Sequence, residues 1–405
     1  MHSFIDKWRR LPRIAYIFGV SNFVIAAGAF VMPFLTLMLT KKLGMSTLEA
    51  AFYVNIVFVA YVPATILGGW LTDRIGRKTV YIGAICLEIL ATACAGFYAN
   101  QFELIYFLFA IAFMNGMVSP VMQAWQADYS TPENRQMVFG TSYFGWNLGF
   151  AIGPAVAGLL FNNHFQLMFW GDAFTTFCAM VLILFLLPHE KPEQTETESP
   201  EREAEKAHEG GMWSLLLSRP RLLLFALVGY FLNLIYGQMA FSVPIHLDAT
   251  FGADGPAIFG QLWMVNALMV VVFTPFVAGL SGRYSTYFNI AIAAVCYGIG
   301  FSLLGSTNSF MLLSMSIAVF TFGEVMSATN SQAHIANESP KNFRGRMSGT
   351  LNLLIGAGYG MSPLLSGLFI DKWGIEMIWP TVFGIGMVCA VAILLIRPKS
   401  VVAAS

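Results

Sequence analysis

Long apolar runs, each close to the length of a membrane-spanning helix, follow one another along almost the whole chain. A helix needs about 20 apolar residues to cross a hydrocarbon core of about 30 Å. Only structures that satisfy their backbone polar groups internally are stable in that core. The composition agrees, since 57% of the residues are hydrophobic, 11% are charged and the mean hydropathy is +0.67. We therefore expect an all-α integral membrane protein.

Twelve such runs can be distinguished, and each is expected to form one membrane-spanning helix. The first run is too long for the core of a signal peptide and no small-residue cleavage pattern follows it, so it is expected to be retained. The runs lie near residues 14–39, 48–71, 79–98, 104–126, 137–161, 167–187, 221–245, 257–280, 287–305, 309–333, 346–370 and 377–396.

The basic residues predict the orientation, because Lys and Arg accumulate in short cytoplasmic loops. With both termini in the cytoplasm, all 22 basic residues except Lys41, Lys42 and Lys372 fall on the cytoplasmic side. The chain is therefore expected to be a multi-pass protein of the cell inner (cytoplasmic) membrane, with both termini cytoplasmic.

One segment departs from the apolar pattern. Residues 189–211 hold eight glutamates and two prolines, and no aliphatic side chain larger than that of Ala. Such a composition cannot bury enough apolar surface to become ordered. We expect an acidic cytoplasmic linker at 189–220 between two six-helix bundles, at 1–188 and 221–405.

The two halves share a sequence register. Gly140-Thr141 with Pro154 and Gly158 recurs 209 positions later, and Arg74 matches Arg283 at the same offset. The later set is Gly349-Thr350 with Pro363 and Gly367. Parallel six-helix repeats related by an axis along the membrane normal are an architecture of secondary transporters.

The loop between the second and third runs combines glycines, one acid and three cations. Its glycines permit a tight turn, Asp73 can meet the positive end of a helix, and the cations can pair with Asp128 at the end of the fourth run. We expect a conformational latch here rather than a substrate site, and a one-sided latch, because Gly282 replaces the acid in the second half. The latch residues are Gly69, Asp73, Arg74, Gly76, Arg77, Lys78 and Asp128.

The fifth run carries small residues at helical spacing, followed by a proline. Small residues let helices approach closely, and a proline weakens local hydrogen bonding and favours a bend. Generic close packing and a role in the direction of transport both remain open for this motif. Its members are Gly145, Gly149, Gly153, Pro154 and Gly158.

These motifs resemble those of the major facilitator superfamily, and in particular its drug:proton antiporter branch with twelve helices. The segment Gly69–Lys78 matches the family signature Gly-x-Leu-x-Asp-Arg-x-Gly-Arg-Lys at every specified position. The fifth-run motif is similar to one that the exporters of the superfamily carry. The resemblance implies two pseudo-symmetric six-helix bundles and outward transport.

Further segments are similar to the lactococcal-type multidrug/proton antiporters. They lie around Asp128 and Arg135, at Pro244-Ile245-His246-Leu247 and at Gly323-Glu324. This resemblance implies functional acids at Asp73, Asp128 and Glu324. Two other acids of the family align with Ser142 and Ala240, so a neutral or singly charged lipophilic substrate is expected.

Energy is expected to come from a proton gradient, because the sequence shows no phosphate-binding loop. A proton-coupled carrier needs an ionisable group inside the membrane. Glu324 in the tenth run is the first candidate, with a structural hydrogen bond as the alternative role, and Glu88 in the third run is another. Asp128 is either a latch partner or a protonation switch, and His334 is expected to cap a helix rather than carry a proton.

The family fold implies which helices line a central cavity. Adaptable methionines and flat aromatic rings suit varied apolar ligands, although they also occur for lipid contact alone. The candidate cavity residues are Asn22, Asn115, Met122, Tyr230, Asn233, Tyr236, Gln238, Glu324 and Met326.

Three functional classes follow. The first is a monomeric, proton-coupled exporter of small lipophilic compounds that works by alternating access, as multidrug efflux proteins do. The second is an importer or facilitator of a metabolite, peptide or lipid on the same fold, and the third is a non-transporting membrane sensor. The five cysteines show no paired spacing, and no nucleophile triad, metal cluster, nucleotide-binding pattern or nucleic-acid-binding pattern is present in the sequence. We therefore expect neither an enzyme nor a bound cofactor.

Overall fold

The computed structural model describes residues 13–130, 134–187, 219–338 and 344–397. Almost all of the predicted acidic linker, both chain termini and their predicted cytoplasmic position lie outside these residues. The described chain is helical, and no strand occurs in it.

The described helices form two compact units. One unit contains α2 to α9 together with Val243–Val271, and the other contains α12, η3 and the chain from Val272 to α18. The first unit begins with α2 (Arg13–Ala27), η1 (Met32–Phe34), α3 (Leu35–Leu37), η2 (Met38–Lys42), α4 (Thr47–Ile75), α5 (Arg77–Phe97), α6 (Leu104–Asp128), α7 (Arg135–Phe150), α8 (Gly153–Leu160) and α9 (Phe165–Leu186). The chain continues with α12 (Pro220–Tyr236), η3 (Gly237–Met239), α13 (Ser242–Phe251), η4 (Gly252–Asp254), α14 (Gly255–Ser281), α15 (Thr286–Leu304), α16 (Phe310–Glu338), α17 (Arg344–Trp373), η6 (Ile375–Met377) and α18 (Ile378–Leu395).

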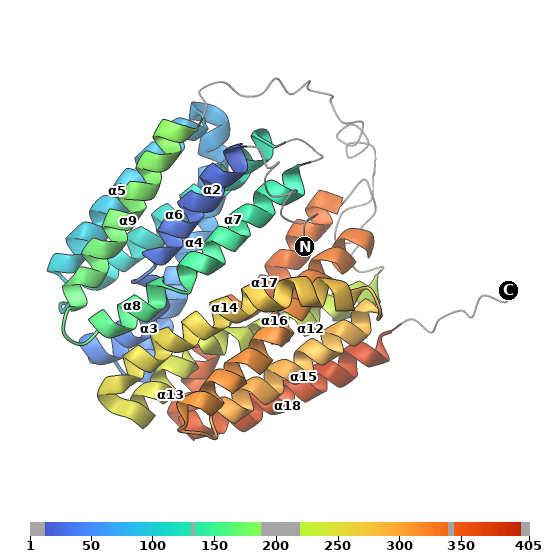
Figure 1. Cartoon of the computed structure of the whole chain (residues 1–405). Helices are drawn as coiled ribbons and strands as arrows, with labels where there is room; N and C mark the ends of the chain where they lie inside the picture. The colour runs from blue at the N-terminus through green and yellow to red at the C-terminus, as the bar shows by residue number, and fades with distance from the viewer. Residues whose placement is uncertain (1–12, 131–133, 188–218, 339–343, 398–405) are drawn as a thin grey trace. The chain divides into compact units, whose positions relative to one another are not determined.

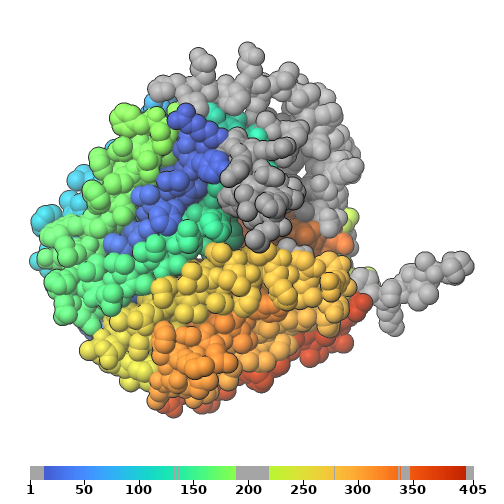
Figure 2. Space-filling view, viewed as in Figure 1, coloured from blue at the N-terminus to red at the C-terminus, as the bar shows by residue number. Residues whose placement is uncertain are grey.

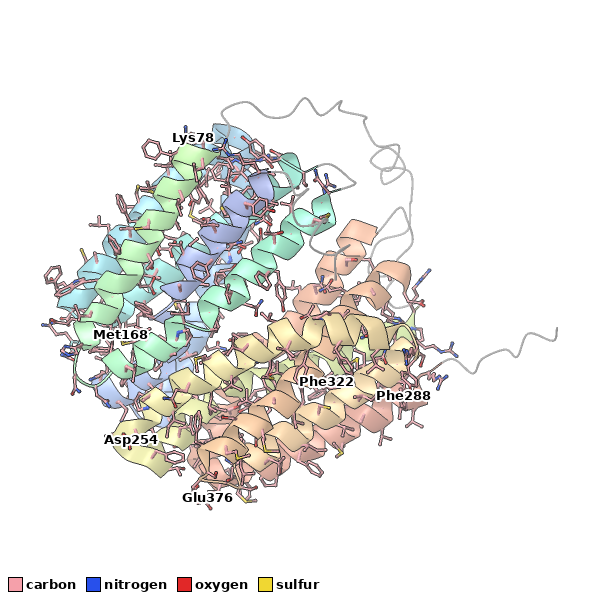
Figure 3. The ribbon with its side chains drawn as sticks, in the orientation of Figure 1. Lys78, Met168, Asp254, Phe288, Phe322 and Glu376 are labelled. Carbon is pink, nitrogen blue, oxygen red and sulfur yellow. The ribbon has the colours of Figure 1, made fainter. Side chains whose placement is uncertain are left out.

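Within each unit the helices pack side by side (Figure 1). In the first unit α2 packs on α7 and α9, α5 packs on α6 and α9, and α4 packs on α6. In the second unit α15 packs on α16 and α18, and α12 packs on α17 and α18. The α4–α5 hairpin with Lys78 and the α13–α14 turn with Asp254 lie at opposite ends of the first unit (Figure 3).

Eleven described stretches are long and apolar enough to cross a membrane. One of them, Pro220–Ser281, spans 62 residues and contains both α12 and α14. It therefore covers two of the expected spans, so the eleven stretches account for the twelve expected helices. The all-helical membrane architecture predicted from the sequence is confirmed.

The outward faces of the helices are apolar, as a lipid environment requires. On α9 the side chains of Trp170, Phe174 and Phe185 are exposed, whereas those of Phe169 and Ile183 are buried. This helix forms part of the outer surface of the first unit, in green in Figure 2.

Three expected helices are interrupted: the first, the fifth and the seventh, which passes through η3 between α12 and α13. The first ends at Ala27 and resumes at Met32, where Pro33 stands in the first turn and suits a helix start. The fifth is divided into α7 and α8, because it stops at Phe150 and restarts at Gly153-Pro154. A proline lacks the N–H that would continue the preceding helix, so the bend expected at Pro154 takes the form of a break.

Candidate functional site

The α4–α5 hairpin turns on a single residue. α4 ends at Ile75 and α5 begins at Arg77, and Gly76 between them has a φ of +87°. A side chain at this φ would strain the backbone, so the position requires glycine. The turn places the following cations at the mouth of a cavity.

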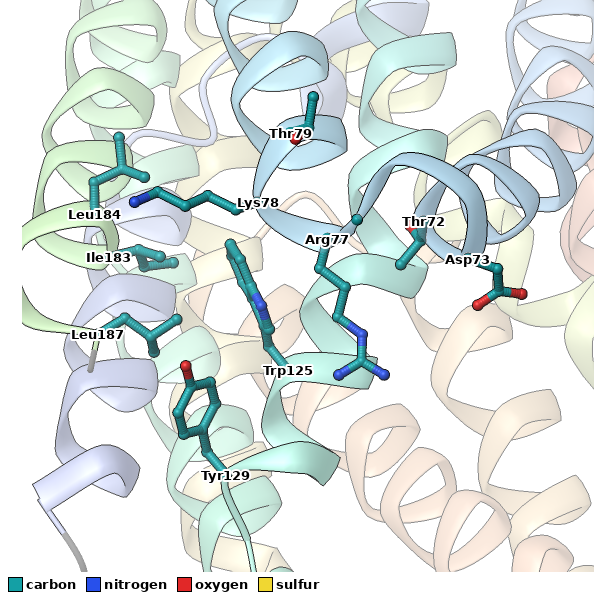
Figure 4. A pocket seen from close by; sticks show the side chains of 11 residues that line it. Thr72, Asp73, Arg77, Lys78, Thr79, Trp125, Tyr129, Ile183, Leu184 and Leu187 are labelled. Carbon is teal, nitrogen blue, oxygen red and sulfur yellow. The ribbon is translucent and has the colours of Figure 1, made fainter. Parts of the chain in front are cut away.

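This cavity has a volume of about 540 Å³ and lies between the end of α4 and helices α5, α6 and α9 (Figure 4). Arg77 forms an ion pair with Asp128 at the end of α6, and Asp128 is the acid expected from the sequence to meet Arg77 or Lys78. Both side chains keep roughly a quarter of their surface exposed, at 27% and 20%. The lining residues are Thr72, Asp73, Gly76, Arg77, Lys78, Thr79, Trp125, Tyr129, Ile183, Leu184 and Leu187.

The other latch candidates take separate positions. Arg74 stacks over the ring of Trp70, with its guanidinium carbon 4.1 Å from the ring centroid. Asp73 is exposed and makes no hydrogen bond or ion pair with any described residue. Gly69, like Gly76, has open space where a Cβ atom would stand. Among the described residues, the ion pair of the predicted latch is therefore that of Arg77 with Asp128.

The glycines of the fifth run lie against the backbone of α2. A Cβ atom at Gly145 would overlap the carbonyl oxygen of Gly19, and one at Gly149 would overlap that of Phe23. A Cβ atom at Gly153 would stand 2.5 Å from the carbonyl oxygen of Ala26. Since real side chains do not tolerate such distances, these glycines permit the close approach of the two helices.

The same line of small residues continues onto the N-terminal turn of α14. A Cβ atom at Gly158 would stand 2.5 Å from the carbonyl oxygen of Pro256, and one at Gly260 would overlap that of Pro154. The fifth-run motif thus contacts α2 on one side and the N-terminal part of α14 on the other, and both contacts lie within the first unit.

A polar cluster closes the end of the first unit opposite the hairpin. Lys41 forms an ion pair with Asp248 and donates a hydrogen bond to the Gly252 carbonyl oxygen over 3.2 Å. Asn162 donates to the carbonyl oxygen of Ala253 over 2.6 Å. The sequence analysis treated Lys41 only as a loop charge, because the pairing depends on α13 lying beside η2.

Glu324 lies on α16 in the second unit and is half-buried. The hydroxyl group of Tyr236 donates a hydrogen bond to its carboxyl group, and Tyr297 lies nearby. The ring of Tyr236 packs on those of Phe320 and Tyr359, each at 5.6 Å between centroids. Two of the predicted cavity residues, Glu324 and Tyr236, are therefore in contact inside an aromatic cluster.

Two other predicted cavity residues, Gln238 and Met326, are buried in contacts between helices in this structure. Gln238 is 1% exposed. Its side-chain amide nitrogen donates hydrogen bonds to Ser362 and Ser366, which join η3 to α17, and its amide oxygen accepts one from Ser242. Met326 is fully buried, and the Ser281 hydroxyl points to its sulfur. Sequence position alone could not distinguish a wall residue from one that fills a helix interface.

The remaining cavity candidates are distributed over both units. Asn22, Tyr230 and Asn233 are half-buried, and Asn233 donates to the Gly229 carbonyl oxygen of its own helix. Met122 belongs to the hydrophobic core of the first unit, together with Trp125 and Val118. Asn115 is exposed on α6, and its side chain donates to Glu88.

Two acids lie inside the first unit, and the sequence analysis missed one of them. Glu88 on α5 is 7% exposed and accepts a hydrogen bond from Asn115 over 3.2 Å. Asp172 on α9 accepts hydrogen bonds from the backbone N–H groups of Phe30 and Val31, each over 3.2 Å. A carboxylate within the sixth apolar run, near its start, was the signal that could have identified Asp172.

His334 does not cap a helix. It lies within α16, is 7% exposed, and packs against the rings of Phe225 and Tyr287 at 4.3 and 5.1 Å between centroids. Among the described residues no group of three or more His, Cys, Asp or Glu side chains is arranged to hold a metal ion.

Comparison with known proteins identifies relatives along the whole chain. The sequence profile described as "Major Facilitator Superfamily" matches residues 17–363 and 290–404. The "Uncharacterized MFS-type transporter YhjO" of Bacillus subtilis is 27% identical over 87% of this chain and 85% of its own length. The "Na(+), Li(+), K(+)/H(+) antiporter" of Planococcus maritimus is 24% identical over 89% of each chain. The "Cis,cis-muconate transport protein" of Acinetobacter baylyi is 21% identical over 90% of this chain and 89% of its own.

Solved structures show the same fold. A crystal structure of a "POT family transporter in complex with thioalcohol conjugated peptide" superposes with a TM-score of 0.80 over 96% of each chain, at 16% identity. At this identity the likeness concerns the fold, which is a multi-pass helical membrane fold.

Proposed function

Because the chain belongs to the major facilitator superfamily, whose members here are secondary transporters and not enzymes, we propose that it is a proton-coupled exporter of small lipophilic compounds. It acts by alternating access in the cell inner membrane, with both termini in the cytoplasm. The proton gradient supplies the energy, and the functional unit is a monomer.

The contact between Glu324 and Tyr236 carries this proposal. A carboxylate among aromatic side chains loses hydration, which favours its neutral form. The hydroxyl group of Tyr236 donates to it, which favours the charged form. A group under such opposed influences changes its protonation when a substrate or water alters its surroundings. Glu324 is therefore the proposed coupling group.

The rings around Glu324 support an apolar substrate. Phe320 packs on Tyr236, Tyr297 and Phe301, with centroids 4.7 to 5.6 Å apart. Flat rings contact varied apolar ligands and attract a cation over their faces. One carboxyl group among them suits a neutral or singly charged compound, and Ser142 and Ala240 add no further charge.

The glycine motif supports the proposed direction of transport, and the latch supports the proposed alternating-access cycle. The partly exposed ion pair between Arg77 and Asp128 can open and reform at low cost in free energy. Asp128 loses this pairing when it is protonated, so it can act as a second switch. The glycine line on α7 and α8 resembles that of exporters, which favours outward transport.

A second candidate function is import or facilitated movement of one metabolite. The Acinetobacter relative is named for the transport of cis,cis-muconate, a specific small acid, while the Planococcus relative is named as an antiporter. Specific uptake is the better account if transport runs inward and Glu324 is dispensable. A non-transporting sensor is the third alternative, and it requires that no substrate moves at all.

The test uses purified protein in liposomes with an imposed pH gradient and a lipophilic cation such as ethidium. Gradient-driven movement is expected in the wild type, is lost in Glu324→Gln, and is slowed in Tyr236→Phe, which removes only the hydrogen-bond donor. The matched control is Glu376→Gln, which neutralises an exposed glutamate of the second unit and leaves movement unchanged. Movement at the wild-type rate in Glu324→Gln would remove Glu324 from the coupling role.

A further inference from the structure

The two oxygens of the Glu88 carboxyl group have different surroundings. Oε1 accepts a hydrogen bond from the side-chain amide of Asn115, whereas Oε2 is buried and has no hydrogen-bond partner among the described residues. The side chain is more than nine-tenths buried, between helices α5, α6 and α9. An ionised carboxylate is very unfavourable in an apolar interior when one of its oxygens accepts no hydrogen bond.

Within the described chain, Glu88 forms no ion pair with a basic residue. The titratable groups that interact with it there are Tyr81 on its own helix and Asp172 on α9. The hydroxyl oxygen of Tyr81 is buried and has no hydrogen-bond partner either. A nearby acid makes a second negative charge at Glu88 still less favourable.

Asp172 has the opposite surroundings. Its carboxylate receives the backbone N–H groups of Phe30 and Val31, and the hydroxyl group of Thr176 adds a third hydrogen bond. Three donors stabilise a negative charge even in a buried site. Two neighbouring acids with such different hydrogen bonding separate into one that is neutral and one that is charged.

We propose that Glu88 and Asp172 form a second proton-binding pair inside the first unit, with the proton on Oε2 of Glu88 and the negative charge on Asp172. This site is separate from Glu324 and does not depend on the identity of the substrate. The Asn115 amide marks Oε1 as the carbonyl oxygen of the protonated group.

The donors to Asp172 link this pair to the movement of the first helix. Phe30 and Val31 lie in the interruption between α2 and η1, and the chain just beyond it carries Lys41, which is paired with Asp248. A change at the interruption that withdraws the two N–H groups removes the support for the charge on Asp172. Asp172 then takes up a proton, which couples the protonation of the pair to the conformation of the chain between α2 and η1.

Infrared difference spectroscopy of the purified protein in lipid at neutral pH tests the pair without any substrate. Glu88→Gln keeps the shape and the Asn115 hydrogen bond, and it is expected to remove one band of a protonated carboxyl group. Asp172→Asn is expected to keep that band, and Asn115→Leu is expected to shift it to higher frequency, because the carbonyl oxygen loses its donor. Glu103→Gln, which neutralises an exposed glutamate between α5 and α6, is the matched control and leaves the band unchanged.

Two outcomes would overturn the proposal. If the band survives Glu88→Gln and disappears in Asp172→Asn, the proton is on Asp172. If neither variant changes the spectrum of protonated carboxyl groups, both acids are ionised. A band lost only in Glu324→Gln belongs to the Glu324 carboxyl group, so the result separates this pair from the proposed coupling site.

Discussion

The hairpin between the second and third helices of each unit is built in two different ways. In the first unit Arg77 pairs with Asp128 above an apolar layer that includes Val80 and Val121. In the second unit Val80 and Val121 correspond to Asn289 and Asn330, each 209 positions later. The two asparagines form a buried hydrogen-bond network with Ser281. One half thus has a charged contact over apolar packing, and the other has a neutral network inside the packing.

These two arrangements predict that the two hairpins differ in how easily they open. Asn289 donates to Asn330 over 2.8 Å, and Asn330 donates to the Ser281 hydroxyl over 3.0 Å, and both asparagines are almost fully buried. Breaking such a network leaves polar groups unsatisfied, at about 1–3 kcal/mol for each group. A partly exposed ion pair contributes only about 0–1 kcal/mol. The hairpin of the first unit is therefore expected to open at a smaller cost in free energy than that of the second.

The glycine lines show a second contrast. Gly149 and its counterpart Gly358 both lie against a neighbouring backbone, at Phe23 and Tyr230 respectively. Gly153 corresponds to Ser362, whose hydroxyl group donates to the Leu234 carbonyl oxygen over 2.9 Å. The helix breaks before Gly153-Pro154 in the first unit, whereas α17 continues through Pro363. Both halves therefore have a close contact between helices at this motif, but only the first half has a break in the helix.

The largest effect is expected from adding one methyl group to the glycine lines. Gly149→Ala and Gly358→Ala should each lower the free energy of unfolding by about 3 kcal/mol, because the backbones must separate. Thermal unfolding in detergent measures this change. Gly140→Ala and Gly349→Ala, also 209 positions apart, have open space and should be neutral or stabilising by up to about 1 kcal/mol. Equal effects at all four positions would show that the close contacts do not limit stability.

The amide network gives the next effect. Asn330→Val, which introduces the residue type found at position 121, should cost about 2 kcal/mol, because Asn289 loses an acceptor in a buried place. The double variant Asn289→Val with Asn330→Val should recover part of that loss, since it recreates the apolar layer of the first unit. A double-mutant cycle on unfolding free energies measures the coupling. Additive costs would contradict a shared network.

The turn at Gly76 is expected to give a smaller loss. Its counterpart Ser285 has an ordinary φ of −68° and accepts from the Phe288 N–H group, so serine suits that position and not the first. Gly76→Ser should destabilise by about 1–2 kcal/mol through backbone strain. Ser285→Gly should cost only about a few tenths of a kcal/mol. A reversed order in the unfolding temperatures of the two variants would argue against the turn geometry.

The smallest change in stability is expected at the ion pair. Asp128→Asn should lower unfolding free energy by at most about 1 kcal/mol, and less at high salt, because the pair is partly exposed. Its effect should instead be on the conformational equilibrium, measured as the labelling rate of a cysteine placed at Thr79 in the cavity. Arg283→Gln in the second unit removes an exposed charge and serves as the control. A loss of several kcal/mol in Asp128→Asn would show that the pair is a structural element.

Part of the site could be read from the sequence. The hairpin residues are contiguous, so local chemistry identifies the glycine turn at Gly76 and the cations beside it. The glycines at every fourth position of α7 similarly indicate a close helix contact, although not that α2 provides it. The roles of Gln238 and Met326 could not be assigned, because the side of a helix that faces a neighbour depends on rotation and packing.

The sequence alone determined the helical membrane fold, the number of apolar spans and the charged hairpin, because hydrophobic length and loop charge act locally and need no knowledge of neighbours. Only the tertiary structure decided which distant residues meet. The contacts of Asp172 with the Phe30–Val31 backbone, of Lys41 with Asp248 and of Tyr236 with Glu324 each join separate helices. In an interior poor in water a polar group is stabilised only by the partner that packing brings to it. The local sequence around that group does not identify this partner.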